Sequence, residues 1–151
     1  MPQIPSDSAA ADGIAKNPAG RFRSAGFLLS FSMTNKDFIE HWVALFNARK
    51  TDELANLYAP DATNHQVANQ PIHGRENIRA MFEQEFAAAE MVCIIENIFA
   101  DGEWAILEWR DPLGLRGCGF FHLVNQQIVF QRGYWDKLSF LRQHGLPVPE
   151  K

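Results

Sequence analysis

The fold of this chain is decided by one stretch near its end, Gln127-Ile128-Val129-Phe130-Gln131-Arg132-Gly133-Tyr134-Trp135-Asp136. Branched and aromatic residues dominate this stretch, which predicts a β-strand. Regular alternation then places Ile128, Phe130, Arg132, Tyr134 and Asp136 on one face. A carboxylate that ends a largely apolar face is costly unless it is solvated, paired or used in chemistry. Asp136 is therefore a candidate functional residue; the alternative is that it caps the segment 137–141.

The elements before this strand predict an α+β domain. Thr34 followed by Asp37 is a helix start, and the next apolar residues recur at helical spacing. A second short helix is expected from Thr51 to Tyr58, where Pro60 stops it, and a third follows Gly74. Strands are expected at residues 91–99, 104–109 and 117–124, before the stretch quoted above. Helices followed by an antiparallel meander are typical of the α+β class.

Composition limits the classes of partner. A chain of 151 residues with 46% hydrophobic and 21% charged residues fits one globular domain. The net charge of −4 argues against nucleic acid as the main partner, and no apolar run approaches a membrane span. Cys93 and Cys118 stand in apolar runs without metal-ligand spacing, which indicates free thiols in a reducing compartment, so we expect a cytoplasmic protein.

The first 32 residues differ from the rest of the chain. They are rich in small and polar residues and contain the helix-breaking segment Asn17-Pro18-Ala19-Gly20. We interpret residues 1–32 as a disordered tail or the product of a wrongly assigned start codon. The folded domain is then expected at residues 33–151.

The end of the chain also resembles a known family. Ile128, Tyr134, Trp135 and Asp136 precede a short leucine-rich tail, and Tyr58-Ala59-Pro60-Asp61-Ala62 and Gly74-Arg75 occur earlier. This order resembles the nuclear transport factor 2-like superfamily, and within it the SnoaL-like polyketide cyclase and ketosteroid isomerase-like branch. The resemblance covers Phe38 to about Pro149. It implies a cone-shaped, curved antiparallel sheet wrapped around the N-terminal helices, with a pocket open at one end.

The resemblance also implies a chemistry. Asp136 matches the aspartate that acts as general acid/base in SnoaL-like cyclases, and burial would raise its pKa so that it removes a proton beside a carbonyl. His65 or a tyrosine is expected to assist it, and the substrate is expected to be a small apolar carbonyl compound. No cofactor and no metal site are expected, because no nucleotide-binding or metal-ligand motif occurs. The expected pocket residues are Trp42, Tyr58, Phe82, Trp104, Phe120, His122, Arg132 and Tyr134.

Two alternatives remain open at this point. Glu108 and Arg110 share a strand face and, with Asp136, partly match the water-activating residues of limonene-epoxide hydrolases, although the acid here precedes the arginine. Glu108 and Arg110 are otherwise a structural pair at the end of the strand. The second alternative is a non-catalytic ligand-binding or dimerisation module. We expect a homodimer in either case, because Trp109 and Trp135 on the sheet face opposite the pocket need a cover.

Overall fold

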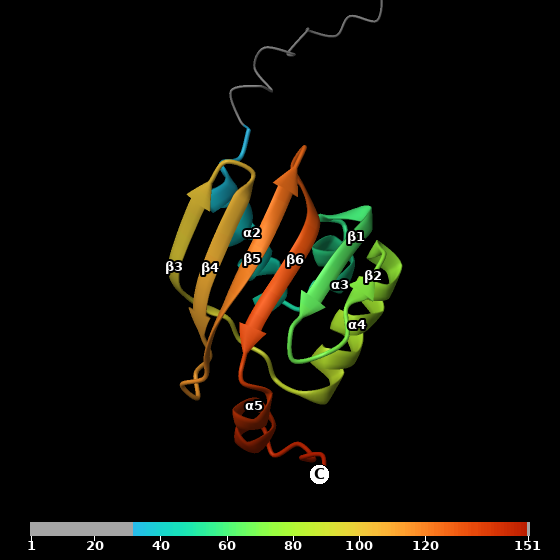
Figure 1. Cartoon of the computed structure of the whole chain (residues 1–151), viewed down its shortest axis with the longest axis vertical. Coiled ribbons are helices and arrows are strands. Elements are labelled where there is room, and N and C mark those ends of the chain that lie inside the picture. The colour runs from blue at the N-terminus through green and yellow to red at the C-terminus, as the bar shows by residue number, and fades with distance from the viewer. Residues whose placement is uncertain (1–31, 151) are drawn as a thin grey trace, which may run out of the picture. The chain divides into compact units, whose positions relative to one another are not determined.

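The computed structural model describes residues 32–150 of the chain (Figure 1). Within this range, one six-stranded sheet has the order β2-β1-β6-β5-β4-β3. The helices are α2 (Asn35–Asn47), α3 (Thr51–Ala55), α4 (Arg75–Ala88) and α5 (Lys137–Gln143). The strands are β1 (Tyr58–Gln66), β2 (Ile72–His73), β3 (Ile94–Asp101), β4 (Trp104–Arg110), β5 (Arg116–Val124) and β6 (Gln127–Trp135). The expectation for the N-terminal tail falls on residues 1–31, which lie outside the described residues.

The first helix forms as its sequence predicts. The Thr34 hydroxyl accepts from the Asp37 backbone N–H at 3.1 Å, and the Asp37 carboxylate accepts from the Thr34 N–H at 3.3 Å, which completes a capping box. The apolar face of α2, including Phe38 and Trp42, is buried. In Figure 1, α2 and α3 lie behind the sheet and α4 lies beside β1 and β2.

The second helix is shorter than expected. It ends at Ala55, and Tyr58 begins β1, which pairs in parallel with β6. Pro60 is tolerated within β1 because the pairing with β6 is interrupted between Tyr58 and Thr63, where no backbone N–H is needed for that ladder. The sheet is therefore mixed, and the expectation of a purely antiparallel sheet is wrong at this one pair of strands.

The antiparallel meander β3-β4-β5-β6 is confirmed, together with its turns. Asp101 ends β3 next to Gly102, which has a positive φ of 55°. Asn125 and Gln126 form the β5–β6 turn with φ of 50° and 60°. Two successive residues with positive φ are typical of a type I′ hairpin turn, which suits the twist of the strands it joins.

A β-bulge in β6 reverses the faces that regular alternation predicts. His122 and Leu123 are neighbours on β5, but their partners Phe130 and Ile128 on β6 are two positions apart. Val129 is therefore an extra residue in the ladder. Ile128 before the bulge is fully buried. Beyond the bulge, Gln131 is buried with 4% of its surface exposed, whereas Phe130 and Arg132 are only half-buried.

Aromatic side chains form much of the core between the helices and the sheet. The rings of Trp42 and Phe46 stack with centroids 5.2 Å apart, and Trp42 meets Phe121 of β5 edge to face at 5.3 Å. Phe86 of α4 meets Phe46 at 5.2 Å. Such pairs contribute about 0.5–1.5 kcal/mol each beyond their buried area. Across residues 32–150, none of the helices combines the length and the apolar composition that crossing a bilayer requires.

Candidate functional site

A cavity of about 290 Å³ lies between the inner face of the sheet, α4 and α5. Most of its wall is apolar. Trp42 and Phe82, both expected at a pocket, line it together with Trp109, Phe121, Trp135 and Phe140. Its size lies at the small end of the range for ligand sites, and such sites are mainly apolar with a few polar groups that fix orientation.

A buried set of polar side chains supports one wall. The Trp42 indole Nε1–H donates to the Tyr58 hydroxyl at 3.0 Å, and this hydroxyl donates to Gln131 Oε1. The Asn64 amide also donates to Gln131 Oε1, at 3.2 Å. These bonds use the oxygen of the Gln131 amide and so fix its direction. The Nε2 of Gln131, which lines the cavity, keeps its donor hydrogens for another acceptor.

The same polar set continues toward α5. Gln66 donates to Asn64 Oδ1 at 2.8 Å and accepts from the Trp135 indole at 2.9 Å. Gly133 makes room for it, because a Cβ on Gly133 would lie 1.9 Å from Gln66 Oε1. The glycine in β6 is therefore required for the close approach of this amide.

Glu85 is one of two acidic residues in the cavity wall. It stands on α4 three residues after Phe82, which brings both side chains to the same face of the helix. Among residues 32–150, no hydrogen-bond donor or cation is paired with the Glu85 carboxylate. Burial raises its pKa to about 7. Burial also raises the pKa of the Tyr58 hydroxyl, and the negative charge of Glu85 adds to that rise.

Asp111 and His144 form a second polar group in the wall. Asp111 follows β4 and His144 follows α5, and the two side chains approach to 3.5 Å between Oδ2 and Nε2. Both line the cavity. The cavity thus has two polar regions, one supplied by α4 and β6 and the other by the β4–β5 loop and the C-terminal segment.

The sequence model of the SnoaL-like domain matches residues 39–131, which is more than half of the chain and includes α4, β1 and most of the cavity wall. The chain belongs to the SnoaL-like domain family. A comparison with curated protein sequences finds no match.

Solved structures agree with this assignment at the level of the fold. An NTF2-like protein of unknown function from Cytophaga hutchinsonii superposes with a TM-score of 0.63 at 14% identity, over 73% of this chain and 96% of its own. A hypothetical protein with a ketosteroid isomerase-like fold from Catenulispora acidiphila, in complex with trimethylamine, gives a TM-score of 0.67 at 20% identity, over 77% of this chain and 100% of its own. SalBIII, an epoxide hydrolase/cyclase-like enzyme of pyran ring formation in salinomycin, gives 0.61 at 19% identity, over 68% and 91%.

Asp136 does not enter the cavity of this SnoaL-like domain. It is exposed and caps α5, where its carboxylate accepts from the Leu138 backbone N–H at 3.1 Å and from the Ser139 hydroxyl. The bond from Ser139 is the main reason why the pKa of Asp136 lies below its usual value. The expectation of a buried Asp136 with a raised pKa is therefore wrong, and the helix-capping alternative describes the structure.

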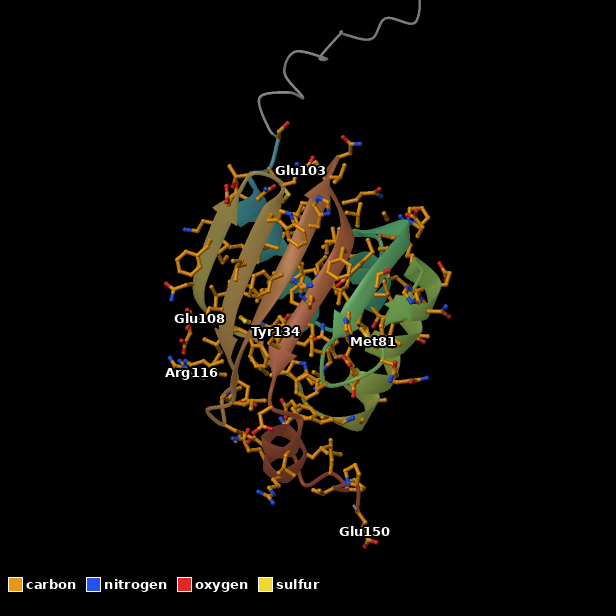
Figure 2. All side chains as sticks on the ribbon, in the orientation of Figure 1. Met81, Glu103, Glu108, Arg116, Tyr134 and Glu150 are labelled. Carbon is orange, nitrogen blue, oxygen red and sulfur yellow. The ribbon has the colours of Figure 1, made fainter. Side chains whose placement is uncertain are left out.

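Glu108 and Arg110 lie on the outer face of the sheet. Glu108 accepts from the Asn97 amide at 2.8 Å, while the Arg110 guanidinium lies 3.5 Å from Glu96 on β3. Figure 2 shows Glu108 and Arg116 on the β3 side of the sheet, away from Met81 on α4. The two residues do not pair with each other and do not converge with Asp136, so the arrangement expected for epoxide hydrolysis is absent from these three residues.

The remaining expected site residues, apart from Tyr58, also lie on the outer face. For Arg132 and Tyr134 on β6, the reason is that the bulge at Val129 reverses the alternation. The Arg132 guanidinium lies 5.7–5.8 Å from three aromatic ring centres. His65 pairs in the ladder with Arg132 and shares its face. The outer-face residues that were expected in the pocket are His65, Trp104, Phe120, His122, Arg132 and Tyr134. Tyr58 is buried in the polar set behind the cavity.

Trp109 and Trp135, expected on the outer face, line the cavity instead. Sequence reasoning missed Glu85, Gln131 and Asp111 as cavity residues. A readable signal existed for Glu85, because it interrupts the apolar face of α4 three residues after Phe82.

Proposed function

We propose that this SnoaL-like domain binds a small, mostly apolar carbonyl compound in the cavity and that Glu85 transfers a proton to or from it. One observation supports this best: the Glu85 carboxyl faces an apolar cavity and has no partner among the described residues. A catalytic acid or base works best when its pKa is close to the working pH. With a pKa of about 7, Glu85 is present in both forms near neutrality.

The proposed step is proton abstraction next to the carbonyl group. The Glu85 carboxylate takes the proton from the α-carbon, and the C–H electron pair moves toward the carbonyl, whose oxygen becomes an enolate. The free Nε2–H of Gln131 is positioned on the cavity wall to donate to that oxygen. Where a carbon–carbon double bond adjoins the α-carbon, the enolate charge extends to the far carbon of that double bond, and return of the proton from Glu85 to that carbon gives isomerisation. Where the same substrate carries a second carbonyl group, attack of the enolate carbon on it gives ring closure, and the alkoxide that forms takes the proton from Glu85.

The relatives support this class of reaction only through the shared fold. SalBIII is an epoxide hydrolase/cyclase-like enzyme, so a fold of this type accommodates chemistry on small organic molecules. Water activation by Glu108, Arg110 and Asp136 is not part of the proposal, since these side chains do not meet.

The test uses a simple ketone, 1-tetralone, in deuterated buffer. We expect the protein to accelerate exchange of the α-hydrogens, followed by NMR, with a rate that rises with pH and levels off above about pH 7. Glu85→Gln should abolish the acceleration because an amide does not accept the proton. Glu83→Gln is the matched control, since Glu83 lies on the same helix but pairs with Arg79 at 3.1 Å. An unchanged rate in Glu85→Gln would refute the role of this carboxylate.

We also propose that a second copy of the chain covers the outer face of the sheet. Tyr134 and Trp104 are 43% and 38% exposed there, and Phe99 of β3 is 56% exposed. A continuous exposed aromatic face is unusual for a monomer, and a twofold dimer buries the same face of both copies at once. This proposal applies equally to a non-catalytic ligand-binding module.

A further inference from the structure

The polar group at the α5 end of the cavity has an unmet acceptor. Asp111 is only 6% exposed, and its Oδ1 accepts from the backbone N–H groups of Leu113 and Leu115, both at 2.9 Å. This oxygen holds the β4–β5 loop. The other oxygen, Oδ2, is buried and has no hydrogen-bond partner among the described residues. A buried acceptor left without a donor is costly, so an external donor would be bound strongly here.

The protein groups nearby do not supply that donor. His144 Nε2 lies 3.5 Å from Oδ2, and the geometry does not form a hydrogen bond. The Lys137 ammonium, which also lines the cavity, donates to Asn69 Oδ1 at 2.6 Å. The carboxylate oxygen and the imidazole nitrogen therefore lie 3.5 Å apart in the wall of the cavity, with Oδ2 covered. A polar atom of a ligand contacts both from the cavity side once a shift of the His144 ring uncovers Oδ2.

We propose that Asp111 and His144 recognise a hydroxyl group of the ligand. A hydroxyl donates to Asp111 Oδ2 and accepts from the Nε2–H of His144 through the same oxygen. With the His144 proton on Nε2, an ammonium group has no lone pair to accept it, and a carbonyl oxygen has no hydrogen for Asp111. This inference rests on the proposed function, and it narrows the substrate class to apolar carbonyl compounds that also carry a hydroxyl group away from the carbonyl.

The experiment compares two ketones that differ only in the hydroxyl, 1-tetralone and 6-hydroxy-1-tetralone, by isothermal titration calorimetry on the full chain. The hydroxylated ketone should bind about tenfold more tightly, the ratio that corresponds to one hydrogen bond to a charged group. Asp111→Asn keeps an amide oxygen for the backbone of the β4–β5 loop but replaces the second acceptor by a donor. We expect this variant to bind 1-tetralone as before and to lose the preference for the hydroxyl.

Three further variants separate this inference from other effects. His144→Phe keeps a ring against Phe140, whose ring centre lies 4.5 Å away, but removes Nε2, and it should reduce the preference several-fold even if Asp111→Asn does not fold. Asp136→Asn, on the exposed cap of α5, should keep the full preference. So should Glu85→Gln, which tests the proposed function independently.

The outcomes are distinct. If the wild-type protein binds the two ketones with equal affinity, the hydroxyl site is refuted and the proposed function stands. The same holds if the preference for the hydroxylated ketone survives in both Asp111→Asn and His144→Phe. If neither ketone binds, small-molecule binding in this cavity is refuted, and the hydroxyl site is refuted with it.

Discussion

Replacing Glu85 by glutamine should stabilise the protein above neutral pH and change it little in acid. A carboxyl whose pKa is higher in the folded state keeps its proton while the unfolded chain releases it. Stability is therefore lost as pH rises from the ordinary value of 4.5 to the folded value of about 7. The amide introduced by Glu85→Gln does not ionise, so the free energy of unfolding of the variant does not fall over this pH range for this reason.

The magnitude of this stabilisation follows from the rise in the pKa of Glu85. One pKa unit corresponds to about 1.4 kcal/mol, so the change in the pKa of Glu85 from 4.5 to about 7 sets an upper limit of about 3.5 kcal/mol. Solvent in the cavity screens part of this, and we expect a gain of about 1–2 kcal/mol in the free energy of unfolding at about pH 8.

Urea denaturation at about pH 5 and about pH 8 measures the effect, with Glu83→Gln as the control. The decisive quantity is the difference in the free energy of unfolding between Glu85→Gln and the wild type, compared at the two pH values. A difference that does not grow with pH would refute the view that the Glu85 carboxylate is desolvated in the cavity, whatever the result of the exchange assay.

Tyr58→Phe leaves the buried Trp42 indole N–H without its acceptor and removes one of the two donors to Gln131 Oε1, and it should lower the free energy of unfolding by about 2 kcal/mol; an unchanged urea midpoint would contradict the buried hydrogen bonds. Gly117→Ala places a Cβ 2.7 Å from the backbone carbonyl of Tyr134 and should cost about 1–3 kcal/mol in thermal unfolding, because backbone moves less readily than side chains. Asp136→Ala should cost about 1 kcal/mol as a lost helix cap, whereas Asp136→Asn should be nearly silent; equal losses would show a role beyond capping. Sedimentation at micromolar concentration should give a dimer that Trp104→Glu converts to a monomer, and a wild-type monomer would remove the association proposal.

Local signals predicted most of the elements. The capping box at Thr34, the apolar face of α2 and the Asn125-Gln126 turn act over a few residues, so the sequence displays them directly. The parallel pairing of β1 with β6 has no such local signal. Tyr58 is assigned to a strand because its hydroxyl and backbone find partners on β6, far along the chain.

One extra residue explains why the expected site residues of β6 were predicted on the wrong face. With Val129 bulged out of the ladder, every side chain of β6 beyond it points to the face opposite the one that alternation predicts. Asp111 carries no local signal of its burial, because that burial depends on the C-terminal segment that brings His144 beside it. Glu85, by contrast, can be identified from the sequence as the acid on an apolar helix face.

The pairing of β1 with β6 also dictates an order of events during folding. Tyr58 and Gln131 are 73 positions apart, so the hydrogen bond between them forms only after the last strand has joined the sheet. Contacts of such high sequence separation slow folding, since the intervening chain must be ordered before they form. A nascent chain that stops before residue 127 would hold α2, α4 and β1 with no partner for the β6 edge of β1, and its cavity wall would lack Gln131, Gly133 and Trp135. During synthesis, the cavity is thus completed by the final sixth of the chain.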